Sequence, residues 1–86
     1  MDGTLTKLPR QNLVIGYRQV VRGIAGNHLR CVVIASDIDN GIMDKLITLC
    51  QDKKVQYRIG STKTEMGKLL ELDVACGVYA ETIVTK

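Results

Sequence analysis

Between residues 13 and 84 the spacing of apolar residues changes repeatedly, and this alternation constrains the fold more than any other feature of the chain. Short apolar runs predict strands at 13–15, 31–35, 55–59 and 76–84. Between them, apolar side chains recur every three or four residues, which predicts amphipathic helices at 16–25, 42–54 and 62–70. Strands and helices that alternate in this way are typical of a small α/β domain, with helices on both faces of a sheet of about four strands.

Residues at the expected ends of these elements support the boundaries. Residues 39–41 supply turn and N-cap chemistry ahead of the second helix. Ser61 or Thr62 can cap the third helix, and Glu65 follows Thr62 by three residues, as in a capping box. The uninterrupted run 31–35 predicts a strand that is covered on both faces. The apolar stripe of the first helix consists of Tyr17, Val20, Val21 and Ile24.

Chain length and the absence of long apolar runs limit the class of protein. With 86 residues the chain has room for one domain, residues 1–86, and one core. No apolar run approaches the roughly 20 residues that cross a bilayer, and the amino-terminus shows no secretion signal. We therefore expect a cytoplasmic protein that makes no membrane contact.

Few groups in the chain suit catalysis or metal binding. His28 is the single histidine, and Cys31, Cys50 and Cys76 are widely spaced, so neither a zinc site nor a Ser/His/Asp set can be assembled. Each cysteine lies in an apolar segment, which predicts a small buried side chain. Glycine-rich phosphate-binding motifs are absent. We expect no enzymatic activity, no metal and no cofactor.

Charge is distributed unevenly along the chain. The first 36 residues contain five basic residues, Lys7, Arg10, Arg18, Arg22 and Arg30, and only one acidic residue. The remaining 50 residues contain seven basic and eight acidic residues. Such asymmetry favours a polyanionic partner for the amino-terminal part, and nucleic acid is the first candidate.

The strongest candidate for a binding segment begins at Gly16. A helix that opens at a glycine presents free backbone N–H groups and the positive end of its dipole. Arg18 and Arg22 are four residues apart and project from one face, beside Gln19, whose amide both donates and accepts. The trio suits phosphates and base edges. An ordinary solvated helix face explains the same pattern equally well.

Three further segments have functional and purely structural interpretations. Asp37 and Asp39 follow a central strand, where ligands commonly bind, but a turn and a helix cap account for both. Lys63 lies in the first turn of the third helix, where a phosphate partner suits it, although surface lysines need no special reason. Residues 72–76 form an apolar loop that can cover a nucleobase or fold into the core.

In this order the segments resemble the kink-turn RNA-binding ribosomal protein family, the L7Ae and L30e type, in its small bacterial branch. The resemblance extends from about Asn12 to Val84 and depends on five stretches. These are Gly16-x-x-Gln19-x-x-Arg22, Val32-Val33-Ile34-Ala35-x-Asp37-x-Asp39, Leu49-Cys50-x-Asp52-Lys53-x-Val55, Lys63-x-x-Met66-Gly67 and Leu72-Asp73-Val74-x-Cys76.

The resemblance implies a three-layer α-β-α sandwich with a mixed sheet of about four strands, and a function in binding sharply bent RNA with tandem sheared G·A pairs. It implies that the helix start contacts the G·A edges, that Asp39 lies near a flipped-out nucleotide, and that Lys63 approaches the RNA backbone. The loop would pack over the extruded base. The implied RNA-binding residues are Gly16, Arg18, Gln19, Arg22, Asp39, Lys63, Leu72, Asp73, Val74, Ala75 and Cys76.

The chain departs from the family pattern at several positions. Arg18 and Gln19 stand where the archaeal and eukaryotic proteins have Asn-Glu, a proline expected near Asn40 is missing, and Glu71 replaces a usual glycine. The leading hypothesis is a non-catalytic protein that binds kink-turn-like ribosomal or other non-coding RNA, with association with the ribosome as a further expectation. The alternative is a protein–protein adaptor of the same fold that has lost specific RNA binding.

Overall fold

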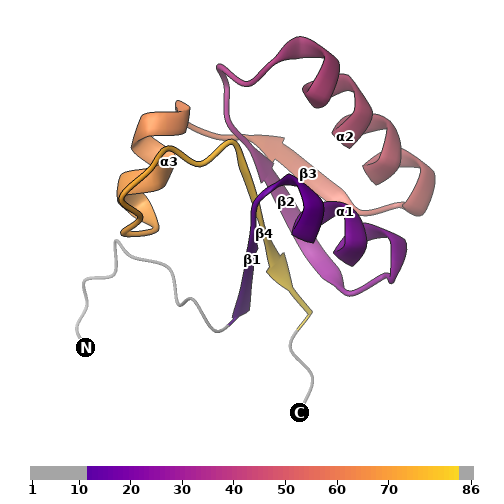
Figure 1. Cartoon of the computed structure of the whole chain (residues 1–86). Coiled ribbons are helices and arrows are strands. Elements are labelled where there is room, and N and C mark those ends of the chain that lie inside the picture. The colour runs from indigo at the N-terminus through magenta and orange to yellow at the C-terminus, as the bar shows by residue number, and fades with distance from the viewer. Residues whose placement is uncertain (1–11, 84–86) are drawn as a thin grey trace.

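A computed structural model describes residues 12–83 of the chain, and strands and helices alternate through this part (Figure 1). Residues 1–11, with Lys7 and Arg10, and residues 84–86, with the expected end of the last strand, lie outside the described part. The elements are β1 (Leu13–Ile15), α1 (Tyr17–Ala25), β2 (Leu29–Ile34), α2 (Asn40–Lys53), β3 (Gln56–Ile59), α3 (Lys63–Leu69) and β4 (Val78–Thr82). The predicted order of elements is therefore confirmed.

The four strands form one mixed sheet in the order β1-β4-β2-β3. Strand β2 pairs with β3 in parallel, whereas β4 is antiparallel to both of its neighbours, β1 and β2. As a result, β1, β2 and β3 all end at the same edge of the sheet, and β4 begins there. We call this region the carboxyl edge; it comprises Gly16 and the first turns of α1 (residues 16–22), residues 35–39, residues 60–63 and residues 72–77.

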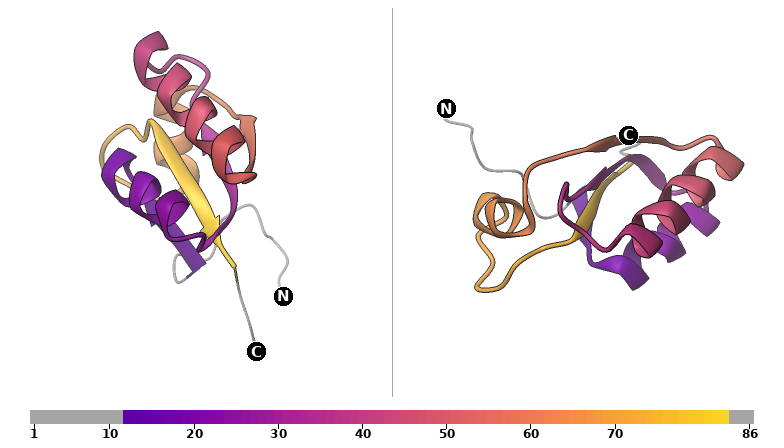
Figure 2. Two further views of the ribbon diagram at one scale, coloured as in Figure 1. Left: turned by 90° about the vertical axis from the view of Figure 1, so that its right-hand side faces the viewer. Right: turned by 90° about the horizontal axis from the view of Figure 1, so that it is seen from above.

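Helices cover both faces of the sheet, which gives the three layers that the family resemblance implied. Helices α1 and α2 pack on one face and α3 packs on the other (Figures 1 and 2). The first core cluster lies under α1 and α2 and consists of Val20, Ile24, Leu29, Val32, Ile34, Leu46, Cys50, Val78 and Ala80. The second lies under α3 and consists of Val33, Ala35, Met66, Leu70, Cys76 and Tyr79.

Strand β2 connects the two clusters because its side chains alternate between the faces of the sheet. Val32 and Ile34 point toward α1 and α2, while Val33 and Ala35 point toward α3, and all four are buried. Burying a side chain such as valine or isoleucine contributes roughly 1.5–3 kcal/mol. The prediction of a strand covered on both faces is confirmed, and β2 is the strand on which the carboxyl edge is built.

Side chains cap two of the helices at their amino-terminal ends, as the sequence predicted. The Asp39 carboxylate accepts a hydrogen bond from the N–H of Ile42 at 3.2 Å and caps α2. Thr62, rather than Ser61, caps α3, because its hydroxyl oxygen accepts from the N–H of Glu65 at 3.2 Å. Each cap satisfies a backbone N–H that has no partner within its helix.

All three helices end in the same backbone conformation, in which a residue just after the helix is left-handed. Asn27, Lys54 and Glu71 have φ near +60°, and they are the non-glycine residues with positive φ among residues 12–83. The residue after each of them donates its backbone N–H to a carbonyl in the last turn of the helix. In α3, for example, the N–H of Leu72 donates to the carbonyl of Gly67 at 2.8 Å. This arrangement is the Schellman motif, which usually places a glycine at the left-handed position.

Candidate nucleic-acid interface

Backbone hydrogen bonds join the four candidate segments at the carboxyl edge. The N–H of Gly16 donates to the carbonyl of Val78 at 3.0 Å, so the start of α1 is fixed to the start of β4. The N–H of Ala35 donates to Gly77 at 2.8 Å, and the N–H of Ser36 donates to Ser61 at 2.9 Å. Segments that are far apart in the sequence therefore form one continuous rim.

Gly16 gives α1 an uncapped amino-terminal end. Its φ of 100° and ψ of 154° lie in a region that is essentially restricted to glycine. Gly16 has no side chain to cap the helix, and the first turn contains no acidic residue. Among the side chains of residues 12–83, none accepts from the first N–H groups of α1, so nothing in this part of the chain neutralises the positive end of the helix dipole.

Helix α1 presents its polar side chains to solvent. Arg18, Gln19 and Arg22 are all exposed, whereas Val20 and Ile24 are fully buried beneath them. Together with Tyr17 and Val21, the three polar residues line an open hollow of about 430 Å³. The exposed trio can therefore reach a partner without any change in the packing of the helix.

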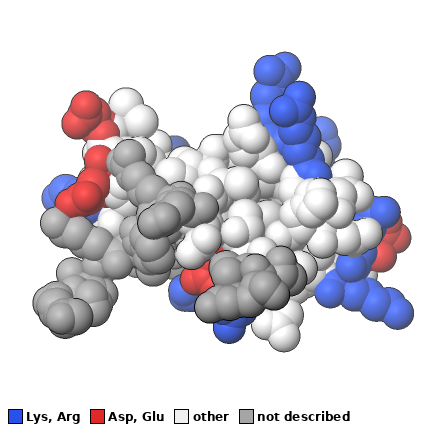
Figure 3. All heavy atoms as spheres, turned by 90° about the horizontal axis from the view of Figure 1, so that it is seen from below, with Lys and Arg blue, Asp and Glu red and all other residues white. Residues whose placement is uncertain are grey.

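Charged side chains are unevenly distributed on one face of the molecule. On the face shown in Figure 3, most of the visible Lys and Arg atoms lie on the side of α1 and α2, and most of the visible Asp and Glu atoms lie on the side of α3. Glu65, Glu71 and Asp73 belong to α3 and the loop after it, and all are exposed. The basic part of the carboxyl edge is thus the α1 part.

The two aspartates after β2 both serve as helix caps. Asp39 caps α2, and the Asp37 carboxylate accepts from the backbone N–H of Lys63 at 2.8 Å, at the start of α3. The sequence offered a turn-and-cap interpretation for both aspartates, and this is where the structure places them. Among residues 12–83, no three His, Cys, Asp or Glu residues lie close enough together to hold a metal ion.

The backbone of Lys63 connects two segments of the rim. Its N–H donates to Asp37, and its carbonyl accepts from the N–H of Cys76 at 3.0 Å. The loop after β2, the start of α3 and the loop before β4 are therefore bonded in series through one residue. The Lys63 side chain is exposed beside this junction.

Residues 72–76 form a loop whose backbone packs closely against α3. A Cβ atom on Gly67 would overlap the carbonyl oxygen of Val74 and would lie 3.2 Å from Cα of Ala75, so only a glycine permits this approach. Asp73, Val74 and Ala75 are exposed, Val74 to 69%, while Leu72 packs partly on the second core cluster. The tip of the loop therefore carries an apolar side chain into solvent.

Cys76, at the end of the loop, points into the core instead. It is 3% exposed, and its Sγ donates to the carbonyl of Val78 at 3.3 Å. Burial raises the pKa of the Cys76 thiol, and it also raises the pKa of Cys50 in the first core cluster. The predicted burial of cysteines holds for these two, while Cys31 is half-buried. In this structure Cys76 supports the loop from beneath.

Three residues at or beside the carboxyl edge were not among the predicted site residues. The sequence placed Asp37 in a turn or a helix cap, and its bond to Lys63 spans 26 residues, which no local pattern reveals. Thr64 and Lys68 line a hollow of about 220 Å³ together with residues 72–75. The spacing of four between Thr64 and Lys68, which places them on one face of α3, was the signal available in the sequence.

Sequence comparison identifies relatives along most of the chain. An RNA-binding protein of Bacillus pumilus is 24% identical over 70 residues, which cover 81% of this chain and 85% of the relative. RNA-binding protein TTE2299 of Caldanaerobacter subterraneus subsp. tengcongensis matches with the same identity and coverage. No helix within residues 12–83 is long and apolar enough to span a bilayer.

Solved structures share the fold. A protein of unknown function from Bacillus halodurans C superimposes with a TM-score of 0.81 at 17% identity, covering 87% of this chain and 75% of that one. The Giardia lamblia 15.5kD RNA binding protein superimposes with a TM-score of 0.80 at 24% identity, covering 87% of this chain and 63% of that one.

The family model of the ribosomal protein L7Ae/L30e/S12e/Gadd45 family matches residues 3–86, which is nearly the whole sequence. The order of the elements and the mixed sheet agree with the fold that the resemblance implied. The chain belongs to the ribosomal protein L7Ae/L30e/S12e/Gadd45 family.

Proposed function

We propose that this protein binds structured RNA at the carboxyl edge, without catalysis, and that its target is a kink-turn-like motif with tandem sheared G·A pairs. The observation that carries the proposal is the convergence of four segments on one rim, with the uncapped start of α1 and the exposed Arg18, Gln19 and Arg22 at its basic end. Relatives named as RNA-binding proteins support it.

The chemistry of each candidate residue suits a different part of the RNA. Arg18, Arg22 and Lys63 are exposed cations that suit phosphate oxygens, which give affinity but little sequence information. Gln19 can donate and accept, so it suits the edges of G·A pairs. The exposed Val74 at the tip of the 72–76 loop offers an apolar surface for an extruded base, with Asp39 near the same rim.

A titration with two RNAs tests this function. The first carries the kinked motif, and in the second the G·A pairs are converted to Watson–Crick pairs. We expect strong preference for the kinked RNA and a log–log salt slope of about three units, because three cations face phosphates. Equal, weak, salt-sensitive binding to both would leave only a basic surface and would refute specific recognition.

One variant tests base recognition directly. Gln19→Ala should cost roughly 1–3 kcal/mol on the kinked RNA and little on plain duplex. Gln56→Ala is the matched control, since Gln56 is an exposed glutamine at the start of β3, away from the carboxyl edge. Equal losses on the two RNAs would argue against base recognition by Gln19. Co-sedimentation with ribosomal subunits tests whether the target is ribosomal RNA.

The acidic residues beside the loop favour a second candidate. Glu65, Glu71 and Asp73 would repel phosphates that approached the α3 side of the edge. An adaptor of the same fold would instead use the basic face of α1 to bind an acidic protein. Retention on immobilised structured RNA, compared with retention on an acidic-protein column, separates the two functions.

A further inference from the structure

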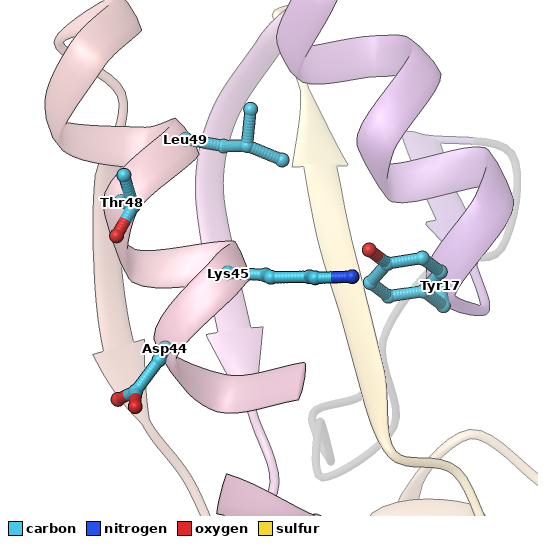
Figure 4. A pocket seen from close by; sticks show the side chains of 5 residues that line it. All are labelled: Tyr17, Asp44, Lys45, Thr48 and Leu49. Carbon is cyan, nitrogen blue, oxygen red and sulfur yellow. The ribbon is translucent and has the colours of Figure 1, made fainter. Parts of the chain in front are cut away.

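A groove between α1 and α2 shares Tyr17 with the first candidate segment, and its other lining residues lie outside the four segments. Tyr17, Asp44, Lys45, Thr48 and Leu49 line it, and its volume is about 390 Å³ (Figure 4). We call it the α1–α2 groove. Tyr17 is 38% exposed although its ring is large and mostly apolar. The groove is therefore an accessible, partly apolar surface that packing between the two helices leaves open.

The groove combines an aromatic ring with a cation. Figure 4 shows the Lys45 side chain extending from α2 toward the ring of Tyr17 on α1, with Leu49 on the same side. The Asp44 carboxylate points away from Tyr17. An aromatic face for a base and a positive charge for its phosphate are the two groups by which proteins bind unpaired nucleotides.

The groove also adjoins the basic part of the carboxyl edge. Tyr17 lines both the α1–α2 groove and the hollow formed with Arg18, Gln19 and Arg22. It directly follows Gly16, so the ring stands at the uncapped start of α1. The side of α1 and α2 is the basic side of the face in Figure 3, which favours continuation of a polyanion in this direction.

We propose that the α1–α2 groove binds one unpaired nucleotide of the RNA, located just outside the kinked motif. The base stacks on the ring of Tyr17, and the adjacent phosphate lies near the ammonium group of Lys45. The inference rests on the proposed function, because it extends the bound RNA from the carboxyl edge across α1.

Three RNAs and matched variants test this site. One RNA is the minimal kinked motif, and each of the other two carries a short single-stranded extension on one of the two strands. For the wild-type protein, we expect the extension on one strand to raise affinity about tenfold, as stacking of one base does. Lys45→Gln should abolish this gain and leave affinity for the minimal RNA unchanged, because Lys45 does not line the hollow formed with Arg18, Gln19 and Arg22. Tyr17→Leu should abolish the gain as well, whatever its effect on the minimal RNA, since Tyr17 lines both the groove and that hollow.

Conservative substitutions separate the chemistry from the fold. Tyr17→Phe keeps the ring and Lys45→Arg keeps the charge, so both should retain the gain from the extension. On the extended RNA, Lys45→Gln should lower the salt slope by about one unit. Lys53→Gln is the matched control, because Lys53 is exposed in the last turn of the same helix and lies outside the groove.

Each other outcome overturns the inference in a recognisable way. No gain from either extension, or a gain that persists in Tyr17→Leu and Lys45→Gln, removes the nucleotide site while RNA binding at the carboxyl edge stands. Equal loss on the minimal and the extended RNAs places Tyr17 in the primary site. Loss of retention on an acidic-protein column, with RNA affinity unchanged, identifies a protein occupant. No preference for the kinked RNA refutes the proposed function and this site with it.

Discussion

Replacing Gly16 by alanine isolates the energetic cost of the backbone conformation that starts α1. A Cβ atom at Gly16 would meet nothing within 4 Å, so the substitution creates no collision. Any change in the free energy of unfolding must therefore come from the backbone angles, a φ of 100° and a ψ of 154°, which residues with a side chain rarely adopt. Few glycines allow a backbone term to be measured without a steric term.

The expected magnitude follows from two opposing contributions. Holding a residue with a side chain in this region costs about 1–3 kcal/mol. Alanine also reduces the conformational freedom of the unfolded chain, which returns about 0.4–1 kcal/mol. The free energy of unfolding should therefore fall by about 1–2 kcal/mol for Gly16→Ala.

Urea unfolding followed by circular dichroism measures this change. With a slope of about 1 kcal/mol per molar urea, the midpoint should fall by about 1–2 M. Gly41→Ala is the control, because Gly41 lies in the first turn of α2, its φ is not positive, and its added Cβ would meet only the terminal Oδ2 of Asp39, at 3.1 Å, which can shift slightly. That variant should stay within about 0.5 kcal/mol or gain stability, since alanine favours helices. A Gly16→Ala protein as stable as the wild type would refute the reasoning.

Three further perturbations have defined outcomes. Gly67→Ala should lower the free energy of unfolding by about 1–3 kcal/mol, because its Cβ would overlap the carbonyl of Val74 and displace the loop. Asp37→Ala should cost about 0.5–2 kcal/mol by leaving the first N–H of α3 without its acceptor, and Asp37→Asn should restore most of the loss. Burial raises the pKa of Cys50 and Cys76 above 9.0, so the unfolded chain releases these protons first. Stability should hold below pH 9 and decline as the pH rises above it, measured by urea unfolding at pH 8 and pH 10.

These predictions fail in different ways. A Gly67→Ala protein that gained stability would show that the 72–76 loop can move away from α3 without a loss of stability. Equal losses for the alanine and asparagine variants of Asp37 would mean that its carboxylate does more than accept one hydrogen bond. Unchanged stability between pH 8 and pH 10, in reducing buffer, would contradict the burial of the two thiols.

Local patterns in the sequence predicted most of the elements because each pattern depends on neighbouring residues. The stripe of α1 correctly placed Val20 and Ile24 in the core, and both predicted N-caps are present. Tyr17 belongs to the same stripe but stays partly exposed, since it stands at the first position of α1 and lines the open groove between α1 and α2. Periodicity alone cannot distinguish the middle of a stripe from its end.

Features that depend on residues far apart in the sequence were not predictable in this way. The strand order places β4 between β1 and β2, and nothing within a short segment specifies its neighbours. The carboxylate of Asp37 finds its partner 26 residues away, so only the assembled sheet brings the two together. The final strand begins at Val78 rather than Cys76, because the backbone N–H of Cys76 is already bonded to Lys63.

The inner position of β4 determines the order in which the sheet can assemble. Leu13 in β1 pairs with Glu81 in β4, and within residues 12–83 β4 is the one strand that pairs with β1. On a ribosome, β2 and β3 can meet as soon as residues 29–59 have emerged, but β1 must wait until β4 has been made. Closing so long a loop is entropically costly. Until that moment, β1 and the start of α1 that follows it have no fixed place, so the basic end of the carboxyl edge would be the last part of the molecule to take shape.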